Sequence, residues 1–470
     1  MERITDGLIR HAQERSTILA VADGPQRLTW AELHAAVLAM AERLTAQGVV
    51  VGDRVALRAH DGAASLVAAL AVLSIGGVHA PVDHTLADAE IASLLSTLQT
   101  PWRLDIPRTA TVADLATISV VSTGLPRVVD PLGPGMSAFL RLSSGTTGAA
   151  KGILLSHRSL LARVTAANRG LKLGTNDRVL WLLPMAYHFA VSILLYIQHG
   201  AAIIFGNALR ASGTATIARE HQVTFAYGSP WHIRRLAELP VGVDLPSTLQ
   251  RVVSTTTALD ATAAADFRTR HGLGVSQGLG IIEVGLPFIS DGLVDEKPGE
   301  LGKPLPDYEI ALFDEQGVLV TKGQSGELAL RGPGLFDAYL TPWRPCDSVL
   351  HHGYFRTGDR AEWTSAGGIR LLGRIKDVIN VGGVKVFPLE VESVLNAHPS
   401  VVGSRVHAQP DARLGEQVHA DIQLKPNTDA ATATEALAAW CAERLAPLKR
   451  PAGYTMVDKL VMTASGKVVR

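Results

Sequence analysis

A short segment of the chain, residues 142–152, gathers hydroxyl side chains, glycines and one lysine in the order LSSGTTGAAKG. Glycines let a backbone adopt positive φ and approach a ligand closely, while hydroxyls and free N–H groups donate hydrogen bonds to anionic oxygens. A segment of this composition is ordinarily a surface turn. Here apolar residues flank it, Phe139 and Leu140 on one side and residues 153–155 on the other, which favours a hairpin between two buried strands. We interpret the segment as a phosphate-binding loop.

This loop is not a Walker A motif, because that motif places its lysine directly after the second glycine, whereas Ala149 and Ala150 intervene here. The segment resembles the phosphate loop of the acyl-adenylate-forming (AMP-binding) superfamily, which contains acyl- and aryl-CoA ligases, the adenylation domains of peptide synthetases, and beetle luciferases. The resemblance implies that Thr146 is catalytic and that Lys151 and the pair of threonines hold pyrophosphate. The other residues that it assigns to the nucleotide are Ser143, Ser144, Gly145, Thr147 and Gly148.

A second segment, QGLGIIE at residues 277–283, ends in a glutamate that follows glycines and apolar residues. A lone glutamate is ordinarily a solvated surface residue, but Mg²⁺ takes one or two carboxylates together with phosphate oxygens. The segment resembles the family motif of an aromatic residue, glycine, any residue, threonine and glutamate. The resemblance implies that Glu283 binds Mg²⁺ and takes part in catalysis, and that Gly278, Leu279 and Gly280 line the nucleotide site.

Two positions of this segment depart from the family motif. Leu279 stands where an aromatic residue commonly stacks on adenine, and Ile282 stands where a threonine usually contacts the α-phosphate. The loss of one stack and one hydrogen bond weakens nucleotide binding by roughly a few kcal/mol. An alternative therefore stays open, namely a degenerate nucleotide- or acyl-binding protein that has lost adenylation.

Two further segments resemble family motifs that hold ribose and join the domains. In GYFRTGD, residues 353–359, the resemblance implies that Asp359 accepts hydrogen bonds from both ribose hydroxyls, a role that suits a carboxylate because it is acceptor-only with two oxygens. In GRIKD, residues 373–377, it implies that Arg374 contacts ribose or phosphate. Lys376 falls at the position of the interdomain hinge, where a few dihedrals absorb a domain rotation.

The last residues, TASGKVVR at 463–470, contain a lysine that would ordinarily be a solvated charge. The segment resembles the one that carries the family's catalytic lysine. The resemblance implies that Lys467 enters the nucleotide site when the small domain closes. Its ammonium there would stabilise the charge that develops between the attacking carboxylate and the α-phosphate.

Three loops resemble those that line the acyl pocket of the family. Residues 181–189 contain the aromatic or histidine gate, and residues 227–231 and 254–258 form two further walls. The third loop has threonines where the family usually has glycines. No aspartate occurs in residues 184–192, which argues against an α-amino acid and favours an aliphatic (fatty) or aryl acid. The substrate-binding candidates are Tyr187, His188, Gly228, Ser229 and Thr255, and Thr257 is assigned to the nucleotide.

Together these motifs imply an ATP-dependent ligase with Mg²⁺ as its metal. A carboxylate attacks the α-phosphorus of ATP, which gives an acyl-adenylate and pyrophosphate. The thiol of coenzyme A or of a phosphopantetheinyl carrier protein (an acyl or peptidyl carrier) then takes the acyl group. Residues 381–388 resemble the segment that swings into the site for this second step.

The elements that must position these motifs follow from hydrophobic patterning and length. A chain of 470 residues is longer than a single hydrophobic core usually accommodates, so at least two domains are expected. Thr29 and Glu32 form a capping box before apolar positions at helical spacing, and strand-like and helix-like segments alternate afterwards, which predicts helix-covered parallel sheets. From about residue 302 short strands and glycine turns indicate a β-rich subdomain.

The family resemblance completes this picture of the fold. It implies an α/β protein whose large N-terminal domain, residues 1–374, holds two helix-covered mixed sheets and the β-rich subdomain. A small, mobile α+β C-terminal domain, residues 375–470, carries the catalytic lysine.

Composition excludes several other classes of protein. Lys plus Arg and Asp plus Glu both number 44, so there is no electrostatic footprint for nucleic acid. The longest apolar stretch, residues 66–75, is too short to span a bilayer, and the N-terminus lacks a signal-peptide pattern. Cys346 and Cys441 lie far apart without metal-ligand spacing. We therefore expect a cytoplasmic enzyme without an integral membrane segment.

Overall fold

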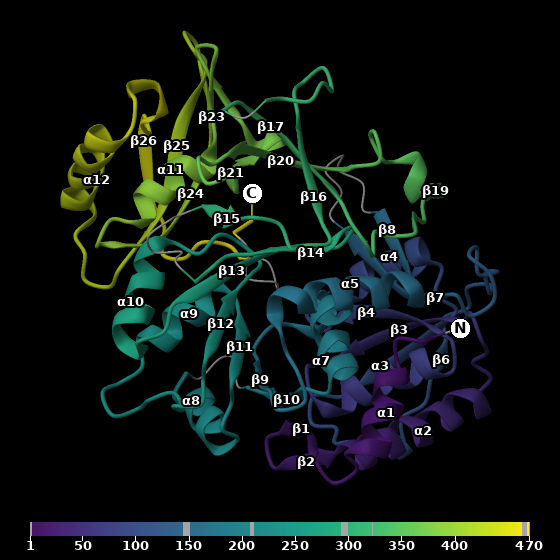
Figure 1. Cartoon of the computed structure of the whole chain (residues 1–470). Helices are drawn as coiled ribbons and strands as arrows, with labels where there is room; N and C mark the ends of the chain where they lie inside the picture. Colours follow the sequence, from purple (N-terminus) through teal and green to yellow (C-terminus); the bar gives the residue numbers. More distant parts are fainter. Residues whose placement is uncertain are drawn as a thin grey trace.

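The computed structural model describes residues 2–143, 151–206, 211–292, 299–321, 323–462 and 468–469. Over these residues the chain forms a large N-terminal body with two eight-stranded sheets and a five-stranded sheet, and a small C-terminal body with its own sheet (Figure 1). The predicted fold class is confirmed. No helix among the described residues is both long enough and apolar enough to cross a membrane.

The first large sheet is parallel in its interior and has an antiparallel strand at each end. The alternation of short apolar strands with helices predicted this parallel arrangement. In spatial order its strands are β14 (Gly285–Ile289), β13 (Val275–Ile281), β12 (Arg251–Ser254), β11 (Phe225–Gly228), β9 (Arg178–Trp181), β10 (Ala202–Phe205), β1 (Leu19–Asp23) and β2 (Gln26–Thr29).

The second large sheet contains the hairpin expected around the phosphate loop. Strands β7 and β8 pair antiparallel, with Phe139 opposite Leu155 and Ser143 opposite Lys151. In spatial order its strands are β19 (Arg344–Pro345), β18 (Ala338–Tyr339), β8 (Lys151–Ser156), β7 (Ser137–Ser143), β4 (Val78–Asp83), β3 (Arg54–Ala59), β5 (Trp102–Ile106) and β6 (Val121–Ser122).

A shared apolar core contains strands of the two large sheets and several helices. The capping box at Thr29 is present and starts α2 as predicted. The helices that contribute to this core are α1 (Asp6–Glu14), α2 (Trp30–Ala46), α3 (Ala63–Ser74), α5 (His157–Leu171) and α7 (Leu194–His199). The outer faces of the sheets are covered by α4 (Asp88–Leu98) on the second sheet and by α8 (Ala211–Glu220), α9 (Pro230–Ala237) and α10 (Ala261–His271) on the first.

The β-rich subdomain is an antiparallel sheet that follows the two large ones in sequence. Its fourth strand in chain order begins within the ribose motif, and its fifth strand ends in the hinge motif. In spatial order the strands are β15 (Glu300–Gly302), β21 (Ile369–Arg374), β20 (Phe355–Trp363), β17 (Ser325–Arg331) and β16 (Glu309–Phe313). A short turn, η4 (Ile375–Asp377), leads from β21 into the small domain.

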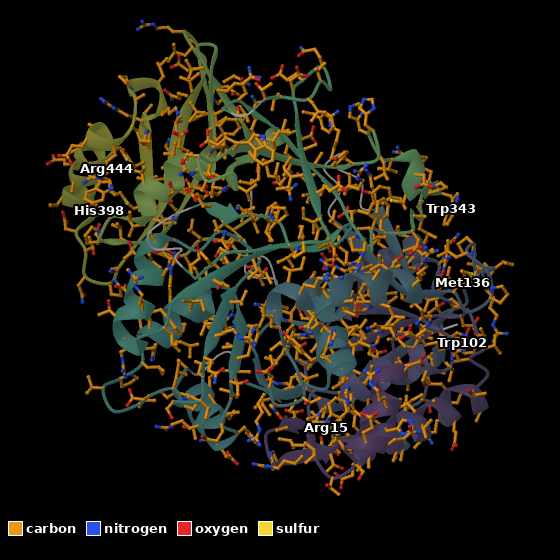
Figure 2. All side chains as sticks on the ribbon, in the orientation of Figure 1. Arg15, Trp102, Met136, Trp343, His398 and Arg444 are labelled. Carbon is orange, nitrogen blue, oxygen red and sulfur yellow. The ribbon has the colours of Figure 1, made fainter. Side chains whose placement is uncertain are left out.

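The small domain packs two helices against one face of its sheet. His398 and Arg444, both labelled in Figure 2, lie against the ring of Trp440 on the helical side of this domain. Its strands are β22 (Ile379–Val381), β23 (Val384–Val386), β24 (Val401–Asp411), β25 (Gly415–Leu424) and β26 (Gly453–Met456), and its helices are α11 (Pro388–Asn396) and α12 (Ala430–Arg444).

Candidate functional site

One cavity of about 600 Å³ brings most of the separate sequence motifs together. Its wall is built from the ends of strands in all three sheets of the large domain and from η4. Because the carboxyl ends of parallel strands meet at one edge of a sheet, residues far apart in sequence converge there. The predicted site residues that line the cavity are Lys151, Tyr187, His188, Thr255, Gly280, Glu283, Arg374 and Lys376.

Other predicted site residues take different positions. Ser144, Gly145, Thr146, Thr147, Gly148 and Lys467 lie outside the described residues, and Ser143 ends β7 directly before them. Six more are described but are not part of the cavity wall, namely Gly228, Ser229, Thr257, Gly278, Leu279 and Asp359. Ser229 instead begins α9, where its hydroxyl lies 2.7 Å from His232 Nδ1.

Glu283 follows β13 and is held by one side-chain and one backbone hydrogen bond. Tyr339 donates a hydrogen bond to Glu283 Oε1 over 3.1 Å, and the backbone carbonyl of Glu283 accepts one from the Phe336 N–H over 2.8 Å. Burial raises the pKa of the Glu283 carboxyl, while backbone hydrogen bonding, Tyr339 and nearby arginines oppose the rise. A fixed, partly buried carboxylate in a wall rich in cations fits a Mg²⁺ ion that is shared with phosphate oxygens.

Lys151 begins β8 and reaches the same tyrosine from the other side. Its Nζ lies 4.9 Å from the centre of the Tyr339 ring, within the range of a cation–π contact. Tyr339 therefore joins the predicted phosphate lysine to the predicted metal ligand. Sequence reasoning missed this residue, because β18 lies in no recognised motif and pairs with β8 only in the fold.

Asp359 and Arg374 face each other across neighbouring strands. They are direct partners in the β20–β21 ladder, and Arg374 Nε lies 3.0 Å from Asp359 Oδ1. Arg374 also donates a hydrogen bond from Nη1 to the Thr357 carbonyl over 2.9 Å. Asp359 is buried behind the cavity wall, and Arg374 forms part of that wall. The two motifs expected to hold ribose and phosphate are thus one structural unit.

The threonine-rich loop after β12 keeps a backbone shape that favours glycine. Thr256 has φ of 82°, which is unusual for a β-branched residue, and its Oγ1 is buried with no hydrogen-bond partner among the described residues. It lines the cavity beside Thr255, whose hydroxyl donates to the Gly278 carbonyl over 3.0 Å. Thr256 was not among the predicted site residues. The family's usual glycines in this loop could have indicated it, because they mark a backbone that lies close to the ligand.

The residues predicted to form the acyl gate lie where one helix type changes to another. Tyr187 and His188 end α6 (Met185–His188), and a π-helical turn, η2 (Phe189–Ile193), follows at once. Such turns are rare in proteins overall, and those that occur are often found at functional sites. Burial raises the pKa of Tyr187 to about 12, so its hydroxyl stays protonated at neutral pH.

Arg141 on β7 is a further wall residue that sequence reasoning missed. It donates a hydrogen bond from Nη1 to the Tyr187 carbonyl over 2.7 Å, and its guanidinium carbon lies 4.9 Å from the Tyr187 ring centre. An arginine inside an otherwise apolar strand was the signal that could have revealed it.

A cluster of metal-ligand types, His407, His419 and Asp421, lies on β24 and β25 of the small domain. None of the three lines the cavity. The Asp421 carboxylate already has Arg405 Nη1 at 3.6 Å, and His419 Nε2 lies 2.8 Å from Thr455 Oγ1. We assign this cluster no part in the site.

A large α/β domain with cations and a carboxylate around one cavity, joined to a small α+β domain, defines an adenylate-forming enzyme. The chain matches the model of the AMP-binding enzyme family over residues 8–340 and that of the AMP-binding enzyme C-terminal domain over residues 390–467. The chain belongs to the AMP-binding enzyme family.

Relatives and solved structures agree with this membership. Feruloyl-CoA synthase from an Amycolatopsis species is 29% identical, over 98% of this chain and 96% of its own. Sulfoacetate–CoA ligase from Cupriavidus necator is 30% identical over 78% and 73% of the two chains. The structure of o-succinylbenzoate CoA synthetase from Bacillus subtilis with its acyl-adenylate intermediate has a TM-score of 0.84 and 26% identity, covering 98% of this chain and 96% of that chain.

The protein is an AMP-forming acid–thiol ligase. It uses ATP and Mg²⁺ to activate a small carboxylic acid as an acyl-adenylate and transfers the acyl group to a thiol.

Proposed function

We propose that the acid is an aromatic carboxylic acid without an α-amino group and that the thiol is coenzyme A. The observation that carries this proposal is the composition of the cavity wall beside Glu283. Tyr227, Ile281 and Leu286 form an apolar surface there, together with Ala190 and Val191. A flat apolar ring buries well against aliphatic and aromatic side chains.

The charges of the wall argue against an amino acid. Among the described residues, the wall contains two acids, Glu283 and Glu327. Glu327 forms an ion pair with Arg356, and Glu283 is assigned to Mg²⁺. A substrate ammonium would therefore meet no available carboxylate and several cations. The names of the relatives feruloyl-CoA synthase and o-succinylbenzoate CoA synthetase point to the same class of aromatic acid and to coenzyme A.

We assign roles to the residues of the first half-reaction by their positions. Mg²⁺, when bound at Glu283, supplies Lewis-acid charge neutralisation at the phosphates. Lys151 holds the pyrophosphate that leaves, and Asp359 and Arg374 orient the ribose. Lys467 approaches the α-phosphate and stabilises the charge that develops as the carboxylate attacks. Catalysis then rests on positioning and electrostatic stabilisation.

The second half-reaction needs the small domain to turn, and we place the boundary after Arg374 with Lys376 as the hinge. Lys376 lies in the short turn η4 and also lines the cavity. The contacts between the domains in this conformation include a hydrogen bond of 2.8 Å from Arg234 Nη1 to the Val402 carbonyl and an ion pair between Lys385 and Glu315. Lys385 belongs to the segment expected to enter the site for thioester formation.

Pyrophosphate release tests the proposal. The purified protein is incubated with Mg²⁺, ATP and a panel of hydroxycinnamic, benzoic, fatty and α-amino acids, first alone and then with coenzyme A or a phosphopantetheinyl carrier protein. We expect release with aromatic acids and thioester formation with coenzyme A. Pyrophosphate release with fatty acids but not with aromatic acids would overturn the proposed acid. Thioester formation with the carrier protein but not with coenzyme A would overturn the proposed thiol. ATP binding with no release for any acid would favour the degenerate binding protein.

A further inference from the structure

We propose that Arg141 is a phosphate-binding residue of the ATP site, which takes the β- and γ-phosphates together with Lys151. This inference rests on the proposed roles of Lys151 and Glu283. The position of Arg141 in the sheet comes first. Arg141 is paired with Ile153, and side chains two positions apart on a strand share a face, so Lys151 and Ile153 of β8 lie on the face of the sheet that carries Arg141. Ser143 is paired with Lys151, which makes Lys151 the diagonal neighbour of Arg141.

The guanidinium of Arg141 has no carboxylate partner within the part of the chain that the structure describes. Among the described residues no carboxylate forms an ion pair with it, its Nε is shielded from solvent without a hydrogen-bond partner, and Nη1 is used on the Tyr187 carbonyl. By contrast, the wall residues Arg356 and Arg374 each have a carboxylate partner. A shielded cation without a counter-ion is costly, and an anionic ligand in the cavity would offset that cost.

The surroundings of Arg141 favour phosphate over the substrate carboxylate. The charges of Glu283 and Arg141 favour each other's ionised form: Glu283 raises the pKa of Arg141, and Arg141 lowers the pKa of Glu283. The guanidinium therefore lies within electrostatic reach of the proposed Mg²⁺ ligand. Phosphate oxygens are expected at that metal, and Lys151 approaches the same region through Tyr339. A planar guanidinium also suits phosphate, because it offers two parallel donors.

Such a contact would compensate for one departure from the family motif. Ile282 stands where a threonine usually contacts the α-phosphate, and it lies in the same wall as Arg141, so a contact to the neighbouring β- and γ-phosphates would offset the lost hydrogen bond in the affinity for ATP. A charge-assisted hydrogen bond is stronger than the neutral one that is missing. The chain would thus retain tight triphosphate binding with a different set of donors.

Direct binding measurements separate this role from others. The affinities of the full-length protein for Mg·ATP, AMP and inorganic pyrophosphate are measured by calorimetry for the wild type, Arg141→Met and Arg141→Lys. Arg331→Met is the matched control, since the side chains of Arg331 and its partner Glu309 are exposed and neither residue lines the cavity. We expect Arg141→Met to weaken ATP and pyrophosphate binding by about tenfold to a hundredfold and AMP binding by less than about twofold. Arg141→Lys should recover part of the loss.

Each other outcome overturns the inference. Equal losses of affinity for ATP and AMP would mean that Arg141 contacts the nucleoside or supports the fold. Unchanged affinities would mean that its role is limited to the hydrogen bond with Tyr187. A loss in acid affinity alone would make it an acyl-pocket residue. Thermal unfolding checks that the variants fold. If Arg141→Met does not fold, the same affinities are compared between the wild type and Arg141→Lys. Failure of the wild type to bind Mg·ATP would instead refute the proposed function.

Discussion

The hydroxyl of Tyr339 donates a hydrogen bond to the carboxylate of Glu283, with 3.1 Å between the two oxygens. Burial raises the pKa of that carboxyl, and the hydrogen bond favours its ionised form. The tyrosine therefore keeps the proposed metal ligand charged in a partly desolvated site, and it does so from a strand that carries no motif.

Tyr339→Phe removes this hydrogen bond and should raise the pKa of Glu283 further. We expect the Mg²⁺ concentration for half-maximal pyrophosphate release to rise by about tenfold or more, because a hydrogen bond to a charged group contributes about 1.5–3 kcal/mol. Since the protonated carboxyl cannot bind the metal, the acidic limb of the rate should move to higher pH. The measurement is a Mg²⁺ titration across pH. An unchanged acidic limb would show that Tyr339 does not act on Glu283.

Asp359→Asn should weaken AMP and ATP binding alike, by about tenfold to a hundredfold, because the lost acceptor serves the ribose that both nucleotides share. The change also removes the ion pair with Arg374, so thermal stability is measured beside affinity. This pattern contrasts with that expected for Arg141, where only nucleotides with β- and γ-phosphates are affected. A selective loss of ATP binding would contradict the ribose role of Asp359.

Lys467→Ala should reduce acyl-adenylate formation by at least about a hundredfold, the size of the effect when one preorganised electrostatic group is removed. Transfer from a chemically prepared acyl-adenylate to the thiol should be retained. Lys459→Ala, an exposed lysine of the same domain, is the control. Normal pyrophosphate release by the Lys467 variant would refute the assigned role.

Thr256→Gly should stabilise the fold, because it relieves a β-branched residue at φ 82° and removes a buried hydroxyl that has no described partner. Strain of this kind costs roughly 1–3 kcal/mol, and the greater freedom of glycine in the unfolded chain offsets part of it, leaving a gain of about 1 kcal/mol. Denaturant unfolding measures the change. Thr257→Gly, at an exposed neighbour with ordinary φ, should destabilise instead, and the same sign for both variants would contradict the strain argument. The cavity should also admit bulkier acids after Thr256→Gly.

The sequence alone determined the class of fold and most of the motifs that meet in the cavity. The reason is that each motif consists of glycines, hydroxyls and charged residues at fixed spacing within one short segment, as in 277–283 and 373–377, so it can be recognised without the rest of the fold. Amphipathic spacing and the Thr29 capping box likewise place α2 without reference to the rest of the chain.

Only the tertiary structure decided how these segments complete one another. The pairing of β18 with β8 brings Tyr339 between Lys151 and Glu283, and the β20–β21 register sets Asp359 against Arg374. The position of the Arg141 guanidinium, without a carboxylate partner among the described residues, and the positive φ of Thr256 are visible only there as well. Strand pairing joins residues nearly two hundred positions apart, as with Tyr339 and Ile153, and no spacing within either segment encodes that contact.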